Sequence, residues 1–442
     1  MKKIILLQLF LLLSICINAS QSDSLLISKY TSIVVDSIKI KGNNTTEEFV
    51  ILRELTFDIG NKVDGETLNY NRERVYSLGI FNIVEFYFLQ EQNKNILVID
   101  VQESWYIYPI PFVQLREDGL KDASYGMNFI YKNFRGRNET LQLLFSLGYD
   151  PTFAVTYYNP LINVKHDLNI LISASYQKLS NKSEIAELLH GNEFDYNYYG
   201  GMLSIGKRLN QFNDIFLIAG FDHYKAPNAN IKGITASGNI EDNTIELGAQ
   251  YIYDSRDLAQ FAKEGLFLSA QYLHKGFGLE SVDYNIIEID FREYRNLIGK
   301  INGKWRIANR FTFGRVVPFY SLSYLGYNEY VRGHRRDNRE GNNYFLMSVE
   351  IYHPILEEWN LSLDLPLIPK SLTTTRIGIQ LNLFADTGIA YNNGERWKTS
   401  NFLSGYGFGI TFLFLPYNSI RFEYALDENR NGEFLIGTGF SF

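Results

Sequence analysis

The chain has only one cysteine among its 442 residues, and after residue 20 it has no apolar run long enough to cross a bilayer as a helix. Cys16 lies inside an N-terminal apolar segment, so a chain that has lost this segment can form neither a disulfide nor a cysteine-ligated metal site. Acidic residues outnumber basic ones, which gives a formal net charge of −7. This acidity argues against a nucleic-acid partner, because phosphate contacts need clustered lysine and arginine.

Motifs of catalysis and of cofactor binding are also missing. The six histidines are scattered without metal-ligand spacing, and the sequence contains no G-x-S-x-G, no P-loop and no H-E-x-x-H. The segment that starts at Asp427 resembles half of a calcium loop, but Thr438 stands where the loop needs its final glutamate. We therefore expect no enzyme activity, no cofactor and no metal.

Residues 1–20 have the pattern of a secretory signal peptide. A basic start at residues 1–3 is followed by an apolar run at 4–17 and by the small residues Ala19 and Ser20. The apolar run is too short to span a bilayer, for which about 20 residues are needed. We expect cleavage after Ala19 or Ser20.

Aromatic residues, in contrast, are abundant, at 15% of the chain. Abundant tyrosine and phenylalanine without apolar runs are typical of membrane β-barrels, which place aromatic girdles at both interfaces. A secreted, soluble β-sandwich could have the same composition, and it is the alternative to a barrel at this stage.

From Trp105 onward, the chain divides into segments of strand length in which apolar and polar residues alternate. Sixteen can be counted: Ile107–Glu117, Tyr125–Asn133, Glu139–Tyr149, Phe153–Tyr158, Asp167–Gln177, Tyr198–Leu209, Ile215–Tyr224, Ile245–Tyr253, Leu266–Lys275, Tyr284–Tyr294, Lys300–Phe313, Tyr344–His353, Arg376–Gly388, Gly405–Phe414, Ile420–Tyr424 and Glu433–Phe442. An even number is what a closed barrel with both ends on one side requires. We predict an all-β membrane barrel of 16 antiparallel strands over residues 105–442.

The lengths of the connections favour the same fold. Connections after odd-numbered segments include the long ones at 179–197, 225–243 and 314–343, whereas most of the others are short. Long outward loops and short inward turns are typical of outer-membrane barrels. Two inward turns, at 254–264 and 354–375, are longer than this rule predicts.

Alternation also assigns the faces of the strands. In the segment Arg376–Gly388, the odd-numbered positions from 377 to 385 are apolar, whereas Gln380, Asn382 and Asp386 share the opposite face. Only the apolar face can contact hydrocarbon, so the polar set must line a wet lumen. Asp386 is therefore expected inside the barrel.

Residues 33–104 have a different pattern, with helical periodicity between short alternating segments. The predicted elements are a strand at Ile33–Lys41, helices at 45–55 and at Asp64–Leu78, and strands at Phe81–Phe88 and Asn95–Val101. Thr45 and Glu48 have the spacing of a capping box that would start the first helix. The order β-α-α-β-β predicts a small α+β domain in front of the barrel.

This domain resembles a POTRA domain, the periplasmic module of outer-membrane assembly proteins of the BamA/TamA type. The resemblance lies in I-K-G-N, I-L-R-E-L and R-E-R-V-Y-S-L-G-I-F-N, with the motif residues Gly42, Asn43, Leu78, Gly79 and Phe81. It implies that the domain receives client proteins as extended segments added to the edge of its sheet. Taken singly, these residues would only build the core and turns of the domain.

The barrel resembles the same family in its last long loop and in the strands that follow. V-R-G-H at 331–334, the segment Ser348–Ile355 and F-A-D-T-G at 384–388 are similar to the family's sixth outer loop and to the wall beside it. In that family the loop folds back into the barrel, and its arginine contacts an acidic residue of the lumenal wall. His334 and Tyr352 depart from the residues usual in the family at these two positions.

Carried over residue by residue, the resemblance implies a lumenal loop lock between Arg332 and Asp386. A guanidinium can bind a carboxylate through two parallel hydrogen bonds. Gly333 would supply backbone freedom, and Val331 and Glu350 would support the motif. The alternative is a solvated Arg332 that pairs with acidic residues of its own loop.

The last segment, Glu433–Phe442, resembles the recognition signal of barrels that the assembly machinery inserts. The resemblance rests on Gly437, Phe440 and the final Phe442. It implies that this protein is itself a client of such machinery. Since similar last strands occur in many outer-membrane proteins, this feature indicates location and not function.

The resemblance implies an assembly or translocation factor of the bacterial outer membrane, with its POTRA domain in the periplasm. Its partners would be unfolded or nascent outer-membrane or secreted proteins, outer-membrane lipid and, in addition, periplasmic or lipoprotein assembly factors. The alternative is a passive channel or surface antigen with a periplasmic interaction domain.

Overall fold

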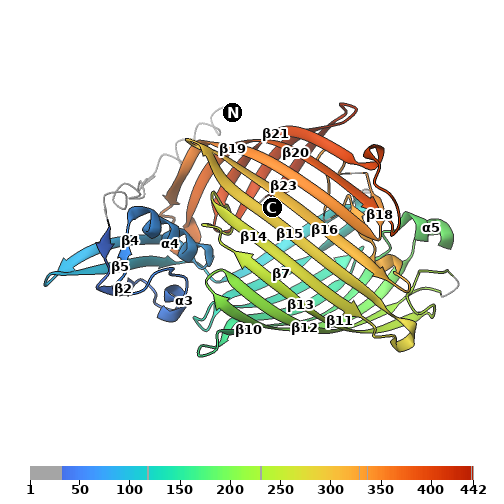
Figure 1. Cartoon of the computed structure of the whole chain (residues 1–442), viewed down its shortest axis with the longest axis horizontal. Helices are drawn as coiled ribbons and strands as arrows, with labels where there is room; N and C mark the ends of the chain where they lie inside the picture. Colours follow the sequence, from blue (N-terminus) through green and yellow to red (C-terminus); the bar gives the residue numbers. More distant parts are fainter. Residues whose placement is uncertain are drawn as a thin grey trace.

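A computed structural model describes residues 32–116, 119–228, 231–327, 329–335, 337–439 and 441 of the chain. An antiparallel sheet of 16 strands forms a barrel, and a small α+β domain covers one end of it (Figure 1). We call the end that this domain covers the near end of the barrel, and the opposite one the far end. The predicted fold class, a 16-stranded barrel behind a β-α-α-β-β domain, is confirmed. The predicted signal peptide at residues 1–20 lies outside the described residues.

The front domain is built around a mixed three-stranded sheet. In spatial order its strands are β2 (Ser37–Lys41), β5 (Lys94–Glu103) and β4 (Phe81–Glu91), with β2 parallel and β4 antiparallel to β5. The other elements are the helices α3 (Glu48–Leu52) and α4 (Gly65–Ser77) and the short paired strands β1 (Ile33–Val34) and β3 (Lys62–Val63). Apolar residues of α4 and alternate residues of β5 meet in a buried core that includes Leu68, Val75, Leu97 and Ile99.

The motif residues of this domain form turns and part of its core. Gly42 follows β2 with φ +80°, and a Cβ at this position would lie 1.8 Å from the carbonyl oxygen of Val101, so only glycine fits. The Asn43 side chain donates a hydrogen bond of 3.0 Å to a backbone carbonyl three residues later. The remaining three follow α4 and lead the chain into the core: Leu78, Gly79 and Phe81.

Two local predictions for this domain are wrong. The expected strand Ile33–Lys41 is interrupted, because β1 pairs with β3 instead of continuing into β2. The expected capping box is absent, since α3 has Glu47 at its N-cap without a side-chain hydrogen bond. The N–H groups of Thr45 and Thr46 instead donate to the Glu103 carboxylate, at 2.9 and 2.7 Å. A tertiary contact from the end of β5 thus replaces the local cap.

The barrel strands correspond one by one to the sixteen predicted segments. They are β6 (Ile107–Arg116), β7 (Gly119–Phe134), β8 (Glu139–Gly148), β9 (Thr152–Asn163), β10 (Leu168–Ser180), β11 (Asp195–Asn210), β12 (Asn213–Lys225), β13 (Glu241–Asp254), β14 (Gly265–Lys275), β15 (Tyr284–Ile298), β16 (Ile301–Gly314), β19 (Asn343–Ser362), β20 (Thr374–Tyr391), β21 (Leu403–Leu415), β22 (Asn418–Asp427) and β23 (Gly432–Thr438). Each pairs with the next in this order, so β6 and β23 are the two end strands. We call the junction between them the seam, and no backbone ladder joins their described residues.

The predicted faces are confirmed along the strands. In β20, Leu381 and Leu383 on the outer face are 42% and 58% exposed, whereas Gln380, Asn382 and Asp386 are buried inside. In β22, Phe422 and Tyr424 point outward and Glu423 points inward. The barrel therefore has an apolar outer surface and a polar lumen.

The longest connections lie at the far end (Figure 1). They contain α5 (Glu184–His190) between β10 and β11, η1 (Leu279–Ser281) after β14, η3 (Thr399–Asn401) after β20, and η2 (Phe319–Ser321) with the hairpin β17 (Ser323–Leu325) and β18 (Arg339–Gly341) between β16 and β19. The two long near-end turns are explained by contacts with the front domain. The turn at 255–264 packs Leu258 and Phe261 into the core of that domain, and the turn at 363–373, which contains α6 (Lys370–Thr373), hydrogen-bonds to Asn82 of β4.

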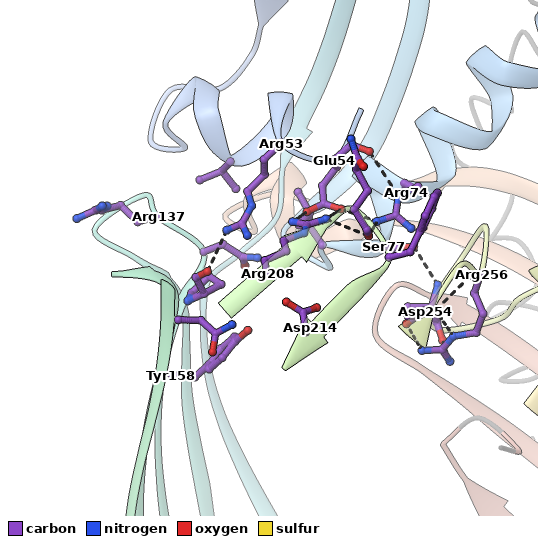
Figure 2. A pocket seen from close by; sticks show the side chains of 18 residues that line it. Arg53, Glu54, Arg74, Ser77, Arg137, Tyr158, Arg208, Asp214, Asp254 and Arg256 are labelled. Atoms are coloured by element: carbon purple, nitrogen blue, oxygen red, sulfur yellow. Dashed lines mark hydrogen bonds and ion pairs between the residues drawn. The ribbon is translucent and has the colours of Figure 1, made fainter. Parts of the chain in front are cut away.

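The front domain is bound to the near mouth through charged groups (Figure 2). Glu54 accepts hydrogen bonds from Arg74 of α4 at 3.0 Å and from Arg208 of β11 at 2.7 Å, so one carboxylate joins both parts. A cavity of about 240 Å³ remains beside these groups. Burial opposes ionisation of Glu54, but the charges and hydrogen bonds of the two arginines outweigh it and lower its pKa.

A second ion pair crosses the same interface. Glu73 of α4 lies 2.6 Å from the Arg376 guanidinium of β20, whose Cζ also sits 4.0 Å from the centre of the Tyr76 ring. Burial raises the pKa of Glu73, but the charges of Arg376 and Arg72 outweigh burial and lower it to about 2. The ionised Glu73 is thus a fixed part of the contact between domain and barrel.

We predict that Glu73→Gln loosens the front domain from the barrel, because Arg376 keeps only the more distant Glu358 at 3.9 Å. Breaking a buried ion pair costs about 3–5 kcal/mol, and the remaining acid places this variant at the lower end. Because the pKa of Glu73 is lowered to about 2, its contribution is present above 4.5 and is lost as the pH falls toward 2. Limited proteolysis between the domain and β6 measures the effect.

The control for this variant is Glu66→Gln, an exposed acid on the same helix. It should leave the cleavage rate unchanged. Equal cleavage rates in wild type, E73Q and E66Q would contradict a docking role for Glu73.

Candidate functional site

The loop between β16 and β19 enters the lumen from the far end and ends in the V-R-G-H turn. Val331, Arg332 and His334 are 0%, 4% and 5% exposed. Arg332 is therefore not the solvated loop arginine of the alternative interpretation. Val331 is held by an apolar cluster with Ala308 and Leu346 of the barrel wall.

Arg332 and Asp386 meet in the lumen. The Nε and Nη2 atoms of Arg332 donate to the two carboxylate oxygens of Asp386 at 2.7 and 2.8 Å, and the backbone N–H of Arg332 donates to the same carboxylate at 3.1 Å. The pairing is bidentate, which fixes the plane of the guanidinium as well as its position. Asp386 is held rigidly, because it lies in β20 between Ser348 of β19 and Gly405 of β21.

Two further carboxylates share the same guanidinium. Nη1 of Arg332 lies 3.1 Å from Glu350 of β19 and 2.9 Å from Glu423 of β22. Glu350 also pairs with Lys304 of β16 at 3.2 Å, and Glu423 lies 3.8 Å from Arg421. Three cations and three carboxylates thus balance, which a low-dielectric interior requires. We call these six residues the lumenal cluster.

The sequence interpretation missed Glu423. Alternation in β22 places this residue in the lumen beside Arg421, but nothing in the sequence indicates that Arg332 of a distant loop reaches it. Phe384 was also missed, although it lies two residues before Asp386 on the same face of β20. The Arg332 guanidinium lies 3.7 Å above the centre of its ring, a cation–π contact.

Two glycines allow the loop to approach the wall. Gly333 has φ +98°, which favours glycine, and a Cβ there would lie 3.2 Å from the backbone of Leu426. Gly405 of β21 is the partner of Asp386 in the ladder, and a Cβ on it would lie 1.8 Å from the carbonyl oxygen of Arg332. Because Gly405 has no side chain, the backbone of the loop at Arg332 can lie directly against β21. This role of Gly405 becomes apparent only when the loop is folded inward.

His334 fixes the far side of the turn. Its Nδ1 lies 2.6 Å from Asp337, and its Nε2 lies 2.7 Å from Glu428. Both nitrogens can donate to carboxylates only when the imidazole is protonated. Burial lowers the pKa of His334, but the hydrogen bonds and charges of Asp337 and Glu428 outweigh burial and raise it above 6.5.

The predicted insertion signal lies partly outside the described residues, which include neither Phe440 nor Phe442. Gly437 lies in β23 opposite Arg421, and a Cβ on it would lie 2.9 Å from the Arg421 guanidinium. Ser441, in contrast, contacts the lumenal cluster, where Lys304 donates a hydrogen bond of 3.0 Å to its carbonyl oxygen.

Metal-ligating side chains are not grouped in the described part of the chain. Within it, no three histidine, aspartate, glutamate or cysteine side chains are grouped so that they could hold a metal ion. None of the helices in these residues is both long and apolar enough to traverse a membrane.

Comparisons with known proteins agree with the fold. A model of the Omp85 superfamily domain matches residues 133–442, and a POTRA model, described as a surface antigen variable number repeat, matches residues 33–104. The structure of BamA from Haemophilus ducreyi lacking POTRA domains 1–3 is similar, with 16% identity, a TM-score of 0.54 and coverage of 92% of this chain and 84% of that one. CdiB from Escherichia coli is similar at 10% identity and a TM-score of 0.51, over 96% and 92% of the two chains. No curated protein matches the sequence.

We predict that Arg332→Ala destabilises the barrel by about 3–5 kcal/mol, because it leaves uncompensated carboxylates in the lumen. Asp386→Ala should cost less, because Glu350 and Glu423 still bind the guanidinium. The double variant should be less destabilised than the sum of the two. The free energy of unfolding in denaturant measures these effects. Arg339→Ala, which removes an exposed arginine of the same loop, is the control, and strictly additive costs would exclude the coupling.

We predict that the V-R-G-H turn loosens as the pH rises. Because the pKa of His334 is raised above 6.5, its contribution is complete below that value and is lost as the pH passes through the higher folded-state pKa. A spin label at the exposed position 335 should become more mobile over this range in the wild type. In the His334→Gln variant the label should be mobile at every pH, whereas in the control His166→Gln it should behave as in the wild type. If the mobility of the label in the wild type did not change with pH, the contact of protonated His334 with Asp337 and Glu428 would be refuted.

Proposed function

The chain belongs to the Omp85 superfamily of bacterial outer-membrane proteins, and we propose that it receives unfolded or nascent outer-membrane or secreted proteins and inserts or translocates them at the barrel wall. Residues 33–104 would be the POTRA domain that faces the periplasm, and residues 105–442 the membrane barrel, after removal of a signal peptide at 1–20. The near end is then periplasmic and the far end extracellular. The apolar outer surface is the face that lipid would cover.

The observation that carries this proposal is the seam. A strand at the end of a sheet has unpaired backbone N–H and C=O groups, which are a template for another strand. In lipid such an edge is costly unless it is paired, because no water reaches it. A seam without a ladder between the described residues of β6 and β23 therefore supports a role in which client strands bind there.

The front domain offers a second edge. Its sheet has the order β2-β5-β4, so β2 and β4 are its edge strands. β4 contacts the barrel at its start, where Asn82 hydrogen-bonds to the turn at 363–373, and we take β2, on which Lys39 is exposed, as the edge open to clients. We propose that clients add an extended segment to β2 before they reach the barrel.

The filled lumen supports assembly over the alternative of a passive channel. The V-R-G-H turn and the lumenal cluster occupy its interior, and the front domain with the turn at 255–264 covers the near mouth. We propose that Arg332 and Asp386 lock the loop in the lumen. Client strands would then pair with the edge strands at the seam in the barrel wall and would not pass through the lumen. This role requires no catalytic residue, cofactor or nucleic acid; outer-membrane lipid and lipoprotein assembly factors would be its further partners.

We predict that a photo-crosslinker at Lys39 captures unfolded outer-membrane or secreted clients, because we take β2 as the edge of the sheet that is open to clients. The matched control is a crosslinker at Lys62 of β3, which is exposed on the same domain but outside the three-stranded sheet. Mass spectrometry of the crosslinked products identifies the clients.

Depletion of the protein completes this test. The proposal requires a selective loss of other barrels or of secreted proteins from the proteome. An unchanged proteome with altered solute uptake, together with no client at Lys39, would instead establish a channel.

A further inference from the structure

We infer that Lys304 and Glu350 hold the end of the last barrel strand inside the lumen, so that one carboxylate connects the seam to the loop lock. Both are positioning residues, because they act through Ser441, which follows β23. The contact itself is independent of clients, although its meaning for strand exchange rests on the proposed function.

The contact is made by a deeply buried lysine. Lys304 of β16 is 3% exposed, and its Nζ donates to the carbonyl oxygen of Ser441 at 3.0 Å and also to the Ser441 hydroxyl. The same hydroxyl lies 3.3 Å from Glu350. Hydrogen bonds from an ammonium are stronger than those between neutral groups, so Ser441 is bound by charge and, among the described residues, not by a ladder.

Ser441 has left the wall at this point. The β22–β23 ladder ends at the pair Ile420 and Thr438, and Gly439 still exchanges hydrogen bonds with Ser419 of β22, at 3.0 and 2.7 Å. Gly439 has φ +91°, a left-handed conformation that ends a strand. In the sheet order, β16 is separated from β23 by β22, β21, β20 and β19, or roughly 24 Å along the wall at about 4.8 Å per strand. Ser441 reaches Lys304 only through the lumen.

The wall at the near end of the seam is closed by side chains instead. Tyr108 of β6 lies with its ring centre 6.0 Å from that of Tyr417, in the turn between β21 and β22. Tyr417 also donates to Asn82 of the front domain. The edge of β6 therefore meets a turn and an aromatic ring here, whereas Ser441 lies inside the lumen.

Glu350 links this arrangement to the loop. Its Oε1 is 3.2 Å from Lys304, and its Oε2 is 3.1 Å from Arg332. Ser441 and Glu350 are both acceptors of the Lys304 ammonium, and the second oxygen of Glu350 accepts from Arg332. The segment after β23 and the loop are thus coupled through one carboxylate.

Hydrogen–deuterium exchange of the full-length protein tests this inference without any client. We expect Lys304→Met to accelerate exchange in the peptide that contains Ser441 by about tenfold or more, since charge-assisted hydrogen bonds are lost. Exchange in the peptide around Arg332 should rise as well, by a smaller factor. Lys304→Arg, which retains the charge, should restore part of the protection in both peptides.

The matched control is Lys275→Met. Lys275 is another buried lumenal lysine, 2.6 Å from both Asp222 and Glu246, but it does not touch the lumenal cluster. Lys275→Met should leave the rate of exchange in both peptides the same as in the wild type. If Lys304 only neutralised Glu350, its replacement would change exchange in β16 and β19 and spare the Ser441 peptide, and this result would overturn the inference.

Ser441→Ala keeps the inference testable if Lys304→Met does not fold, which heat-modifiable gel mobility reveals. It removes one acceptor of Lys304 and the contact with Glu350, so exchange in the last peptide should rise several-fold. Unchanged exchange in a folded S441A protein would overturn the contact. A positive exchange result with no client crosslinked at Lys39 would refute the proposed function and leave the contact standing.

Discussion

The buried guanidinium of Arg332 is the interaction on which the inside of this barrel depends. A loop has little apolar surface with which to stay in a lumen, so a charge must hold it there, and burying that charge is costly unless it is fully paired. Asp386, Glu350 and Glu423 supply this pairing from β20, β19 and β22. A buried carboxylate without a partner would be as costly as an unpaired arginine. The buried charges of the loop and of the three strands are therefore stable only when they are together.

The same constraint governs the near mouth. The outer face of the barrel is apolar, and the ion pairs between the front domain and the barrel are made at its near mouth. Glu54 and Glu73 meet Arg208 and Arg376 there, and the apolar residues of the turn at 255–264 complete the contact. Charge pairs thus hold the loop at one end of the lumen and the front domain at the other, and hydrogen-bonded strands form the wall between them.

Much of this architecture could be predicted from the sequence because its signals are local. Alternation located all sixteen strands and placed Asp386 inside, and the V-R-G-H motif indicated Arg332. The failures involve contacts between distant segments. Thr45 has the spacing of a helix cap, but the Glu103 carboxylate binds its N–H group instead. Gly405 appears as an ordinary strand glycine, and only the folded loop shows that a larger residue would collide with the carbonyl oxygen of Arg332.

The contact of Ser441 ties the seam to the lumenal cluster by charge. If the segment after Thr438 paired with β6, it would gain ladder hydrogen bonds, each contributing about 0.5–1.5 kcal/mol net. In the lumen Ser441 instead accepts charge-assisted bonds from Lys304, which are roughly twice as strong as neutral ones. On the inference drawn above, the balance between the two placements depends on Glu350, which pairs with both Lys304 and Arg332. A change at Arg332 in the loop then alters the balance at the seam, although no residue of the loop needs to touch β6.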